Sequence, residues 1–243
     1  MSEKSWSRWQ SILETVAIVV VAIAVGRMAF ARPAAVTPAR AGAAPTRRPE
    51  APLPSEPVSL SGAQMIGSPT ARIGLVMYSD FECPFCGRFA RETLPALQAQ
   101  YVRSGKVLLA FRQMPLPMHQ FAQKAAEAAE CAGRQAKFWP FHDQLFSDQK
   151  ALGLENLKQS AQKIGLEPHQ FSACLDGQTV GLVKTDSDSA VPLGVSSTPS
   201  FLAGPILADG RVKVSERWTG AVALTQFQSI LDRLAGGTDP AHK

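Results

Sequence analysis

The hydrophobic positions divide this chain into three parts. A nearly continuous apolar run extends from Trp9 to Phe30, and its centre, residues 16–25, contains no polar side chain. A helix needs roughly 20 such residues to cross a bilayer, so the run predicts a transmembrane anchor within residues 1–31. Residues 32–57 are rich in Pro, Ala and Arg and show no apolar period, which predicts an extended, semi-rigid linker. In residues 58–238, apolar runs alternate with segments of helical spacing, which indicates a folded domain.

The folded part has the element order of an α/β domain. Apolar runs predict strands at residues 73–79, 106–112 and 198–204, and Asp209-Gly210 is a turn signal before a further strand at 211–214. The expected helices are 83–104 with a kink at Pro95, 121–149 subdivided by Gly133 and Pro140, 154–164, 168–175, 180–190 and 224–234. This order predicts an α/β sheet with an all-helical insertion at about residues 117–192.

The N-terminal segment has two interpretations. Ala29-Phe30-Ala31 resembles the small-residue site at which a signal peptide is cleaved, and Lys4 and Arg8 form a weak positive region before the apolar run. Arg27 lies inside what would be the cleavage region, and the length of the run favours an uncleaved anchor with Arg27 reaching outward. The linker that follows disfavours a buried core helix.

The net charge of +5 changes this picture little. Residues 1–57 hold seven Lys and Arg against four acidic residues, so most of the excess charge belongs to the tail and nucleic-acid binding is not indicated. The arginines after the apolar run would keep the domain in the cytoplasm by the positive-inside rule. The four cysteines argue instead for export to an oxidising compartment. Long domains translocate largely regardless of charge, so we expect an exported domain.

The strongest chemical signal is Cys83-Pro84-Phe85-Cys86, which follows a predicted strand and opens a predicted helix. The first thiol lies where the helix leaves its N–H groups unpaired, and these groups and the helix dipole favour a thiolate. The second thiol, one turn further, can close a disulfide with the first. Pro84 suits the first helical turn because it needs no N–H partner there. The motif predicts a redox-active Cys83–Cys86 dithiol that needs no other cofactor.

Other uses of a Cys-x-x-Cys pair fit this chain less well. A zinc site needs two further ligands at matching spacing, but the other two cysteines are far apart and the four histidines are scattered. Haem attachment requires a His where Gly87 stands, and an iron–sulfur cluster needs a tighter group of cysteines. A purely structural disulfide across four residues is possible but strained. We therefore expect no metal site.

Several separated segments resemble DsbA-like thiol:disulfide oxidoreductases of the thioredoxin superfamily. In order along the chain they are Ser79-Asp80-Phe81-Glu82-Cys83-Pro84-Phe85-Cys86, Phe111-Arg112-Gln113-Met114-Pro115-Leu116, Ala125-Ala126-Glu127-Ala128-Ala129-Glu130-Cys131-Ala132-Gly133, Lys137-Phe138-Trp139 and Val195-Ser196-Ser197-Thr198-Pro199-Ser200-Phe201. The resemblance covers residues 58–236 and implies a thioredoxin fold with a helical insertion, exported from the cytoplasm.

The resemblance assigns roles to four residues. Cys83 is expected to be the exposed nucleophile that forms mixed disulfides, and Cys86 resolves them. Thr198 and Pro199 are expected to form a cis-proline segment opposite the dithiol, where a bare backbone edge lets a substrate strand pair. Without the dithiol upstream, Thr198-Pro199 would be an ordinary proline at the start of a strand.

Phe85 departs from the strongest oxidants of the family, which carry His at this position. An apolar side chain offers a thiolate no charge or polar hydrogen bond, so we expect a less oxidising site than in those enzymes. Glu82 directly precedes Cys83 and either raises its pKa and relays protons, or is a solvated acid at a helix start. His119 is more often paired or exposed than part of a relay.

Two further groups lie in the predicted insertion. In an oxidising compartment the even number of cysteines favours a structural disulfide between Cys131 and Cys174, and two buried free thiols are the alternative. The aromatic residues of this region are expected to be core more than a peptide groove: Phe121, Phe138, Trp139, Phe141 and Phe146.

These features predict a membrane-tethered thiol:disulfide oxidoreductase, active outside the cytoplasm, that oxidises cysteines of exported proteins. Its re-oxidation requires a membrane redox partner, such as a quinone-linked protein. The same dithiol run in reverse makes a reductase or isomerase, because sequence does not fix the direction. A non-catalytic binding protein with a thioredoxin fold is the alternative of another class, disfavoured because both cysteines and the Thr-Pro pair are present.

Overall fold

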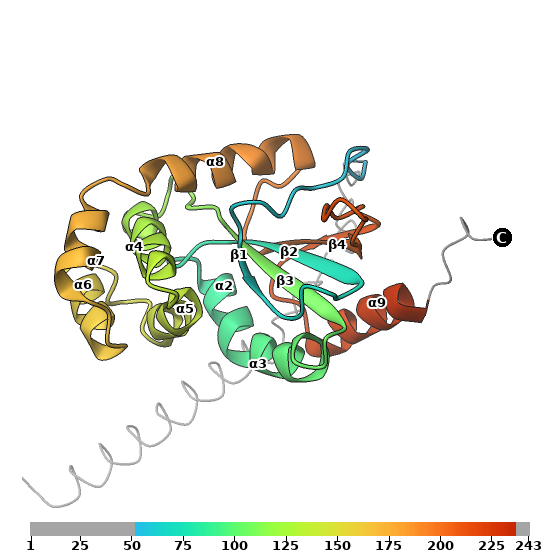
Figure 1. Ribbon diagram of the computed structural model, residues 1–243, viewed down its shortest axis with the longest axis horizontal. Coiled ribbons are helices and arrows are strands. Elements are labelled where there is room, and N and C mark those ends of the chain that lie inside the picture. Colours follow the sequence, from blue (N-terminus) through green and yellow to red (C-terminus); the bar gives the residue numbers. More distant parts are fainter. Residues whose placement is uncertain (1–51, 237–243) are drawn as a thin grey trace, which may run out of the picture. The chain divides into compact units, whose positions relative to one another are not determined.

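The computed structural model describes residues 52–236. Within this range, five strands form one mixed sheet in the order β1-β3-β2-β4-β5, and helices cover both of its faces (Figure 1). The predicted anchor, residues 1–31, and nearly all of the linker lie outside the described residues. In the described part of the chain, no helix is both long enough and apolar enough to cross a membrane.

The elements follow the predicted order except for β1, which was not predicted, and β5, which lies later than expected. The strands are β1 (Gln64–Ile66), β2 (Ile73–Ser79), β3 (Val107–Gln113), β4 (Ser200–Pro205) and β5 (Glu216–Thr219). The helices are α2 (Pro84–Arg88), α3 (Leu94–Leu97), α4 (Ala122–Arg134), α5 (Phe138–Ser147), α6 (Leu154–Lys163), α7 (Pro168–Leu175), α8 (Val180–Ala190) and α9 (Leu224–Gly236). The expected α/β sheet with a helical insertion is thereby confirmed.

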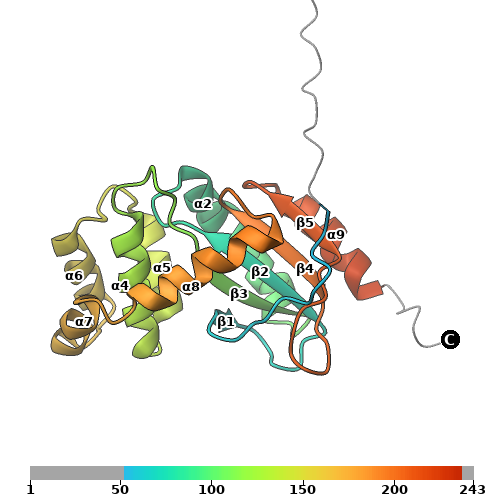
Figure 2. The same cartoon turned by 90° about the horizontal axis from the view of Figure 1, so that it is seen from above.

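β2 is the central strand, and its side chains alternate between two cores. Leu75 and Met77 pack on the face covered by α3 and α9, whereas Val76 and Tyr78 pack on the face covered by α8. Figure 2 shows α8 crossing that second face, with α4–α7 gathered beside one end of the sheet. The strand runs parallel to β3 and antiparallel to β4, so every β2 backbone group is paired or buried.

The helix that follows the cysteines continues past Pro95. Two π-helical turns, Phe89–Thr93 and Gln98–Val102, flank α3, and the Leu94 N–H donates to the carbonyl of Phe89. The wider turn before Pro95 makes room for its ring and tolerates its missing N–H, so the helix does not break.

The division between α4 and α5 differs from the prediction. Gly133 lies inside α4 and Pro140 lies in the first turn of α5, where the backbone N–H groups have no helical partner. The chain turns instead at residues 135–137, where Ala136 has φ 57°. In the insertion, Cys131 of α4 and Cys174 of α7 form a disulfide with a sequence separation of 43. Such a loop is worth at most about 4 kcal/mol in the chain-entropy model.

The hairpin expected around Asp209-Gly210 is present, but residues 211–214 do not form a regular strand. Val212 forms only isolated bridges with Val58 and Ile206, and the true β5 follows at Glu216–Thr219. The reason is a close approach across the sheet. Gly74 and Gly204 pair with each other, and a Cβ on them would lie 2.3 Å from the Val212 side chain and 1.9 Å from the Lys213 carbonyl, respectively. The segment therefore pairs irregularly with the end of β4, where the Lys213 and Ser215 N–H groups donate to the carbonyls of Pro205 and Ala203.

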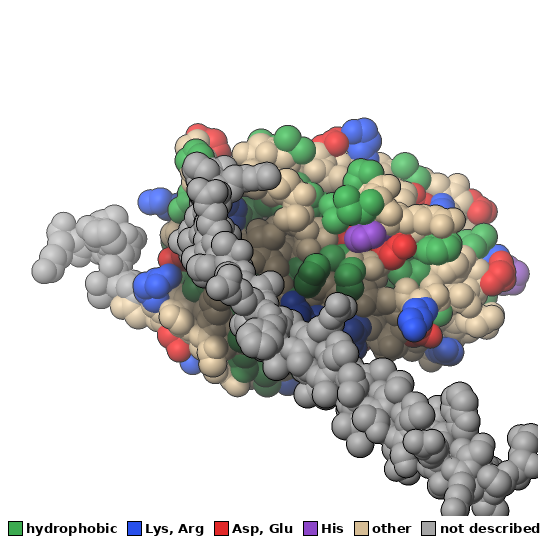
Figure 3. Space-filling view, turned by 180° about the vertical axis from the view of Figure 1, so that it is seen from behind, with side chains coloured by type: hydrophobic (Ala, Val, Ile, Leu, Met, Phe, Trp, Pro, Cys, Tyr) green, Lys and Arg blue, Asp and Glu red, His purple; other side chains and the backbone are tan. Residues whose placement is uncertain are grey.

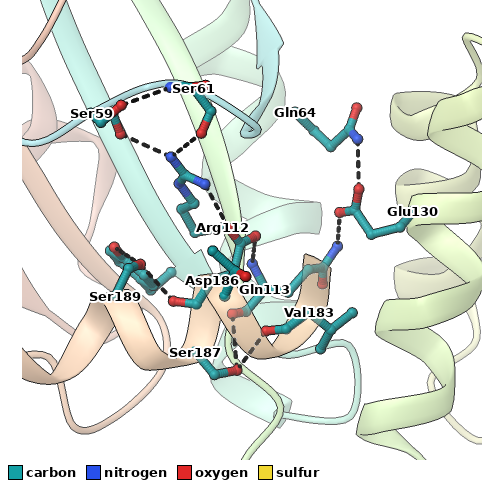
Figure 4. A network of polar contacts seen from close by, with 12 residues as sticks. Ser59, Ser61, Gln64, Arg112, Gln113, Glu130, Val183, Asp186, Ser187 and Ser189 are labelled. Carbon is teal, nitrogen blue, oxygen red and sulfur yellow. Dashed lines mark hydrogen bonds and ion pairs between the residues drawn. The ribbon is translucent and has the colours of Figure 1, made fainter. Parts of the chain in front are cut away.

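A buried polar network joins three parts of the fold (Figure 4). Arg112 of β3 pairs with Asp186 of α8 at 2.6 Å and donates to the carbonyls of Ser59 and Ser61. Burial raises the pKa of Asp186 in spite of the Arg112 charge. The pair is therefore no large net source of stability, but either charge left alone would be costly.

The network extends to α4 through two amide side chains. Gln113 donates its backbone N–H to Asp186 and its side chain to Glu130, and Gln64 donates to the other oxygen of Glu130. Residues 59–64, β3, α4 and α8 are thus held in one arrangement, which positions the insertion beside the end of the sheet.

We predict that Asp186→Ala lowers the free energy of unfolding by about 3–5 kcal/mol, because it leaves the buried Arg112 cation unpaired. Lys184→Ala on the same helix is the control, since it removes only the exposed Lys184–Asp188 pair and should cost about 0.5 kcal/mol or less. Urea unfolding measures both. Equal losses in the two variants would contradict the role of the network.

Candidate active site

Both motif cysteines lie where β2 passes into α2. Cys83 is the N-cap residue of α2, and Pro84 occupies its first turn. β2 ends at Ser79, and the Asp80–Cys83 turn that follows leads directly into α2. The first thiol is therefore placed beside the free N–H groups of a helix N-terminus, as the motif predicted.

The structure describes the dithiol form, because Cys83 and Cys86 are both free thiols. Cys83 is 4% exposed and Cys86 is 1% exposed. The expectation that Cys83 is an exposed nucleophile therefore needs correction. The segment that carries Thr198 lies against it, and the Cys83 thiol donates to the Thr198 carbonyl at 3.4 Å.

The two thiols have opposite acidities. The pKa of Cys83 is lowered to about 5, and the largest cause is a hydrogen bond from the Cys86 thiol. Burial opposes this shift, whereas Thr198 and the backbone N–H groups of Cys86 and Phe85 contribute to it. At neutral pH Cys83 is thus a thiolate, which is the reactive form in disulfide exchange.

Burial raises the pKa of Cys86 well above its ordinary value, and the bond and charge of Cys83 raise it further. The Ser79 hydroxyl and the Asp80 backbone N–H oppose this shift without reversing it. One proton is therefore shared between the sulfurs and is held on Cys86.

The Thr198–Pro199 peptide bond is cis, and it brings Thr198 against the nucleophile. Within residues 52–236 the buried Thr198 hydroxyl has no hydrogen-bond partner. It is available to donate to the Cys83 sulfur once that sulfur is ionised. The Pro199 carbonyl accepts the N–H of Gly220, which anchors the segment to the end of β5.

A buried carboxylate organises the turn before Cys83. Asp80, 1% exposed, accepts the backbone N–H groups of Glu82 and Leu116 at 2.8 Å each and contacts His119 Nδ1 at 2.7 Å. Desolvation alone would lower the pKa of His119. The hydrogen bond to Asp80 and the negative charges of Asp80, Cys83 and Glu82 raise it overall. His119 is thus a proton-binding group within the electrostatic range of the nucleophile.

The remaining motif residues face outward. Glu82 accepts the Phe121 N–H at 2.6 Å and so connects the active-site turn to the start of α4. Phe85 is 53% exposed, and the Arg88 guanidinium lies 5.3 Å from the centre of its ring. The Arg88 guanidinium thus supplies a positive charge beside residue 85, in cation–π contact with the Phe85 ring.

Exposed apolar side chains occur around the site. Met118 is 77% exposed and Phe121 is 42% exposed, and both lie in the segment that supplies His119. Figure 3 shows hydrophobic side chains grouped on one face of the domain beside a histidine and acidic side chains. The other aromatic residues expected in the core do lie in the core. Phe138, Phe141 and Phe146 are buried, and Trp139 is partly buried against them.

Sequence reasoning did not find Asp80 or Ser79. Both residues stand next to the motif, but their contacts reach Leu116, His119 and Cys86, which only folding brings close. The available signal in the sequence was an acidic residue, Asp80, directly after an apolar strand. In the part of the chain that the structure describes, no three His, Cys, Asp or Glu side chains come together as a metal site requires.

Comparison with known proteins gives a consistent family. A family model described as "Thioredoxin" matches residues 60–222. The Na⁺/H⁺ antiporter NhaA 3 of Salinispora tropica is 33% identical over 189 residues, which are 77% of this chain and 28% of that protein. This chain therefore spans little more than a quarter of the length of that relative.

Two further matches extend over most of the length of the matched protein. The probable disulfide bond formation protein D of Bacillus cereus is 30% identical over 167 residues, covering 64% of this chain and 76% of that protein. The crystal structure of oxidised BdbD from Bacillus subtilis aligns with a TM-score of 0.66 at 21% identity, over 76% of this chain and 98% of that chain. The last match is a likeness of fold.

We predict that the Cys83 thiol of the reduced protein ionises with a pKa of about 5. Cys86→Ala should raise this pKa, because it removes the hydrogen bond that lowers the Cys83 pKa most. Titration of the thiolate ultraviolet absorbance measures the change, and Cys83→Ala should abolish the acid step. An unchanged midpoint in Cys86→Ala would rule out this cause.

We predict that His119 stabilises the fold more in acid than in alkali. Its pKa is raised above the ordinary 6.5 in the folded state, so its contribution is full below that value and is lost as pH rises through the raised pKa. His119→Gln should therefore lower the urea midpoint at acidic pH and have less effect at alkaline pH. His169→Gln, an exposed His on α7, is the control. A loss that does not depend on pH would contradict the ion pair.

Proposed function

This chain is a DsbA-like member of the thioredoxin family, and we propose that it is a thiol:disulfide oxidoreductase that forms disulfides in exported proteins through Cys83 and Cys86. The observation that carries the proposal is the opposite acidity of the two thiols, one with a pKa of about 5 and the other with a strongly raised pKa, beside a cis Thr198–Pro199 bond.

The reaction follows from these acidities. A substrate thiolate attacks Cys83 of the Cys83–Cys86 disulfide, and Cys86 leaves and takes up a proton, because its pKa is high. A second substrate thiolate then attacks the substrate sulfur of the mixed disulfide. Cys83 leaves as a thiolate, because its pKa is low. The substrate loses two electrons and gains a disulfide, and the enzyme becomes the dithiol.

The acidities also favour the oxidising direction. A stabilised Cys83 thiolate stabilises the reduced enzyme, which makes its disulfide a better oxidant. The protonated Cys86 is a poor nucleophile, so the mixed disulfide persists long enough for the second substrate thiol to react. The nucleophile of thioredoxin has a pKa of about 7 and that of DsbA about 3.5, so this site falls between a reductant and the strongest oxidant.

The proposed substrates are cysteine-containing segments in extended conformation. The chain before β4 presents the Thr198 backbone beside Cys83, where a strand can pair by main-chain hydrogen bonds. Phe85, Met118 and Phe121 are exposed near the site and would contact apolar side chains of such a segment. This surface suits unfolded proteins, which still expose both cysteines and apolar residues.

We place the domain outside the cytoplasm, tethered by residues 1–31 and spaced from the membrane by residues 32–57. The disulfide between Cys131 and Cys174 supports an oxidising compartment, because structural disulfides are rare in the cytoplasm. Each turnover leaves the enzyme reduced, so a membrane redox partner must accept two electrons from the dithiol.

We predict that the purified protein oxidises reduced ribonuclease and that Cys83→Ser abolishes this activity. Offered scrambled ribonuclease, whose disulfides the Cys83 thiolate can attack, Cys86→Ala should accumulate mixed disulfides on Cys83, because no second enzyme thiol is present to displace the substrate. Redox titration against glutathione should give a potential between about −270 and −120 mV. Unchanged activity of Cys83→Ser would overturn the assignment. Isomerisation of scrambled ribonuclease without oxidation of reduced ribonuclease would show that the dithiol acts as an isomerase and not as an oxidant.

A further inference from the structure

Gln149 contacts the backbone of the active-site turn from the helical insertion. It lies in the turn between α5 and α6, and α5 lies beside the start of the helix that carries the dithiol (Figure 1). Its side-chain Nε2 donates to the carbonyl oxygens of Phe81 and Cys83, at 2.9 Å each. Both carbonyls belong to the turn that holds the nucleophile.

The neighbours of Gln149 fix the orientation of its amide. Arg91 donates to Gln149 Oε1 at 3.3 Å and to the Phe146 carbonyl at 2.7 Å, so Oε1 faces a cation and Nε2 faces the two carbonyls. The space for this contact exists because residue 87 is glycine. A Cβ on Gly87 would lie 1.8 Å from Gln149 Oε1.

The contact adds to a small set of backbone hydrogen bonds that hold Cys83. No side chain caps the N-terminus of α2, the Cys83 N–H donates to the Asp80 carbonyl at 3.2 Å, and among residues 52–236 the Cys83 carbonyl accepts the Gly87 N–H at 3.1 Å besides Gln149. The Cys83 sulfur receives the N–H groups of Phe85 and Cys86 only if residue 83 keeps its position. The Gln149 amide also compensates the negative end of the Cys83 carbonyl dipole, which lies near the developing thiolate.

We propose that Gln149 is a positioning residue for the redox reaction: by holding the Phe81 and Cys83 carbonyls it keeps Cys83 in the geometry that stabilises its thiolate. Gly87 leaves the space for this contact and Arg91 orients the amide. The helical insertion thus sets the chemistry of the dithiol as well as covering it. The inference rests on the proposed function, since it concerns the same two cysteines.

The test uses Gln149→Ala and Gln149→Met, the second of which keeps the side-chain length without a donor. Both should raise the pKa of Cys83 by about 0.5 to 1. In the equilibrium of enzyme disulfide and two glutathiones with enzyme dithiol and glutathione disulfide, both should shift the balance toward enzyme disulfide by about three- to tenfold, as expected for one lost hydrogen bond. Lys150→Ala, an exposed neighbour, is the matched control and should change neither value.

Gly87→Ala provides an independent arm, because its Cβ displaces the Gln149 side chain. It should raise the Cys83 pKa as Gln149→Ala does, and the double variant should raise it no further. Gln149 variants that lose stability but keep the Cys83 pKa and the glutathione equilibrium of the wild type would overturn the proposal. Both measurements need no protein substrate, so a wild type that fails to oxidise ribonuclease would sink the proposed function and leave this test valid.

Discussion

The hydrogen bond from the Cys86 thiol to the Cys83 sulfur is the interaction on which the rest of the active site depends. It is the largest cause of the low pKa of Cys83 and a cause of the high pKa of Cys86. Two chemically identical side chains thereby become one leaving group and one proton carrier. The helix N-terminus strengthens this difference by directing backbone N–H groups at the first sulfur only.

The fold provides the rigidity that this short-range difference requires. β2 is buried on both faces, so its end and the Asp80–Cys83 turn are fixed by packing in two cores. Asp80 satisfies the N–H groups of Glu82 and Leu116, so the turn and the segment leading to α4 move together. The Arg112 network holds α4 and α8 against β3, and it therefore supports the insertion that contacts the site.

Much of the architecture was predictable because it follows local pattern. β2 and α8 were predicted with the bounds that they have, since continuous apolar runs and helical spacing are local properties. The errors arose where distant segments meet. The segment 211–214 is an irregular part of the hairpin and not a regular strand, because Gly74 and Gly204 let it approach the sheet closely, and the α4–α5 boundary lies at Ala136 and not at Pro140. Neither contact leaves a periodic signal in the sequence.

For the site, the sequence alone determined the reacting groups: two cysteines one helical turn apart, a proline in the first turn and a helix behind them. These features require only neighbours along the chain. The tertiary structure decided which environment each group has. It buried Cys83 under Thr198, paired Asp80 with His119 and brought Gln149 to the Cys83 carbonyl across 66 residues. Acidity depends on charges, hydrogen bonds and burial in space, so the chemistry of the dithiol could be fixed only by folding.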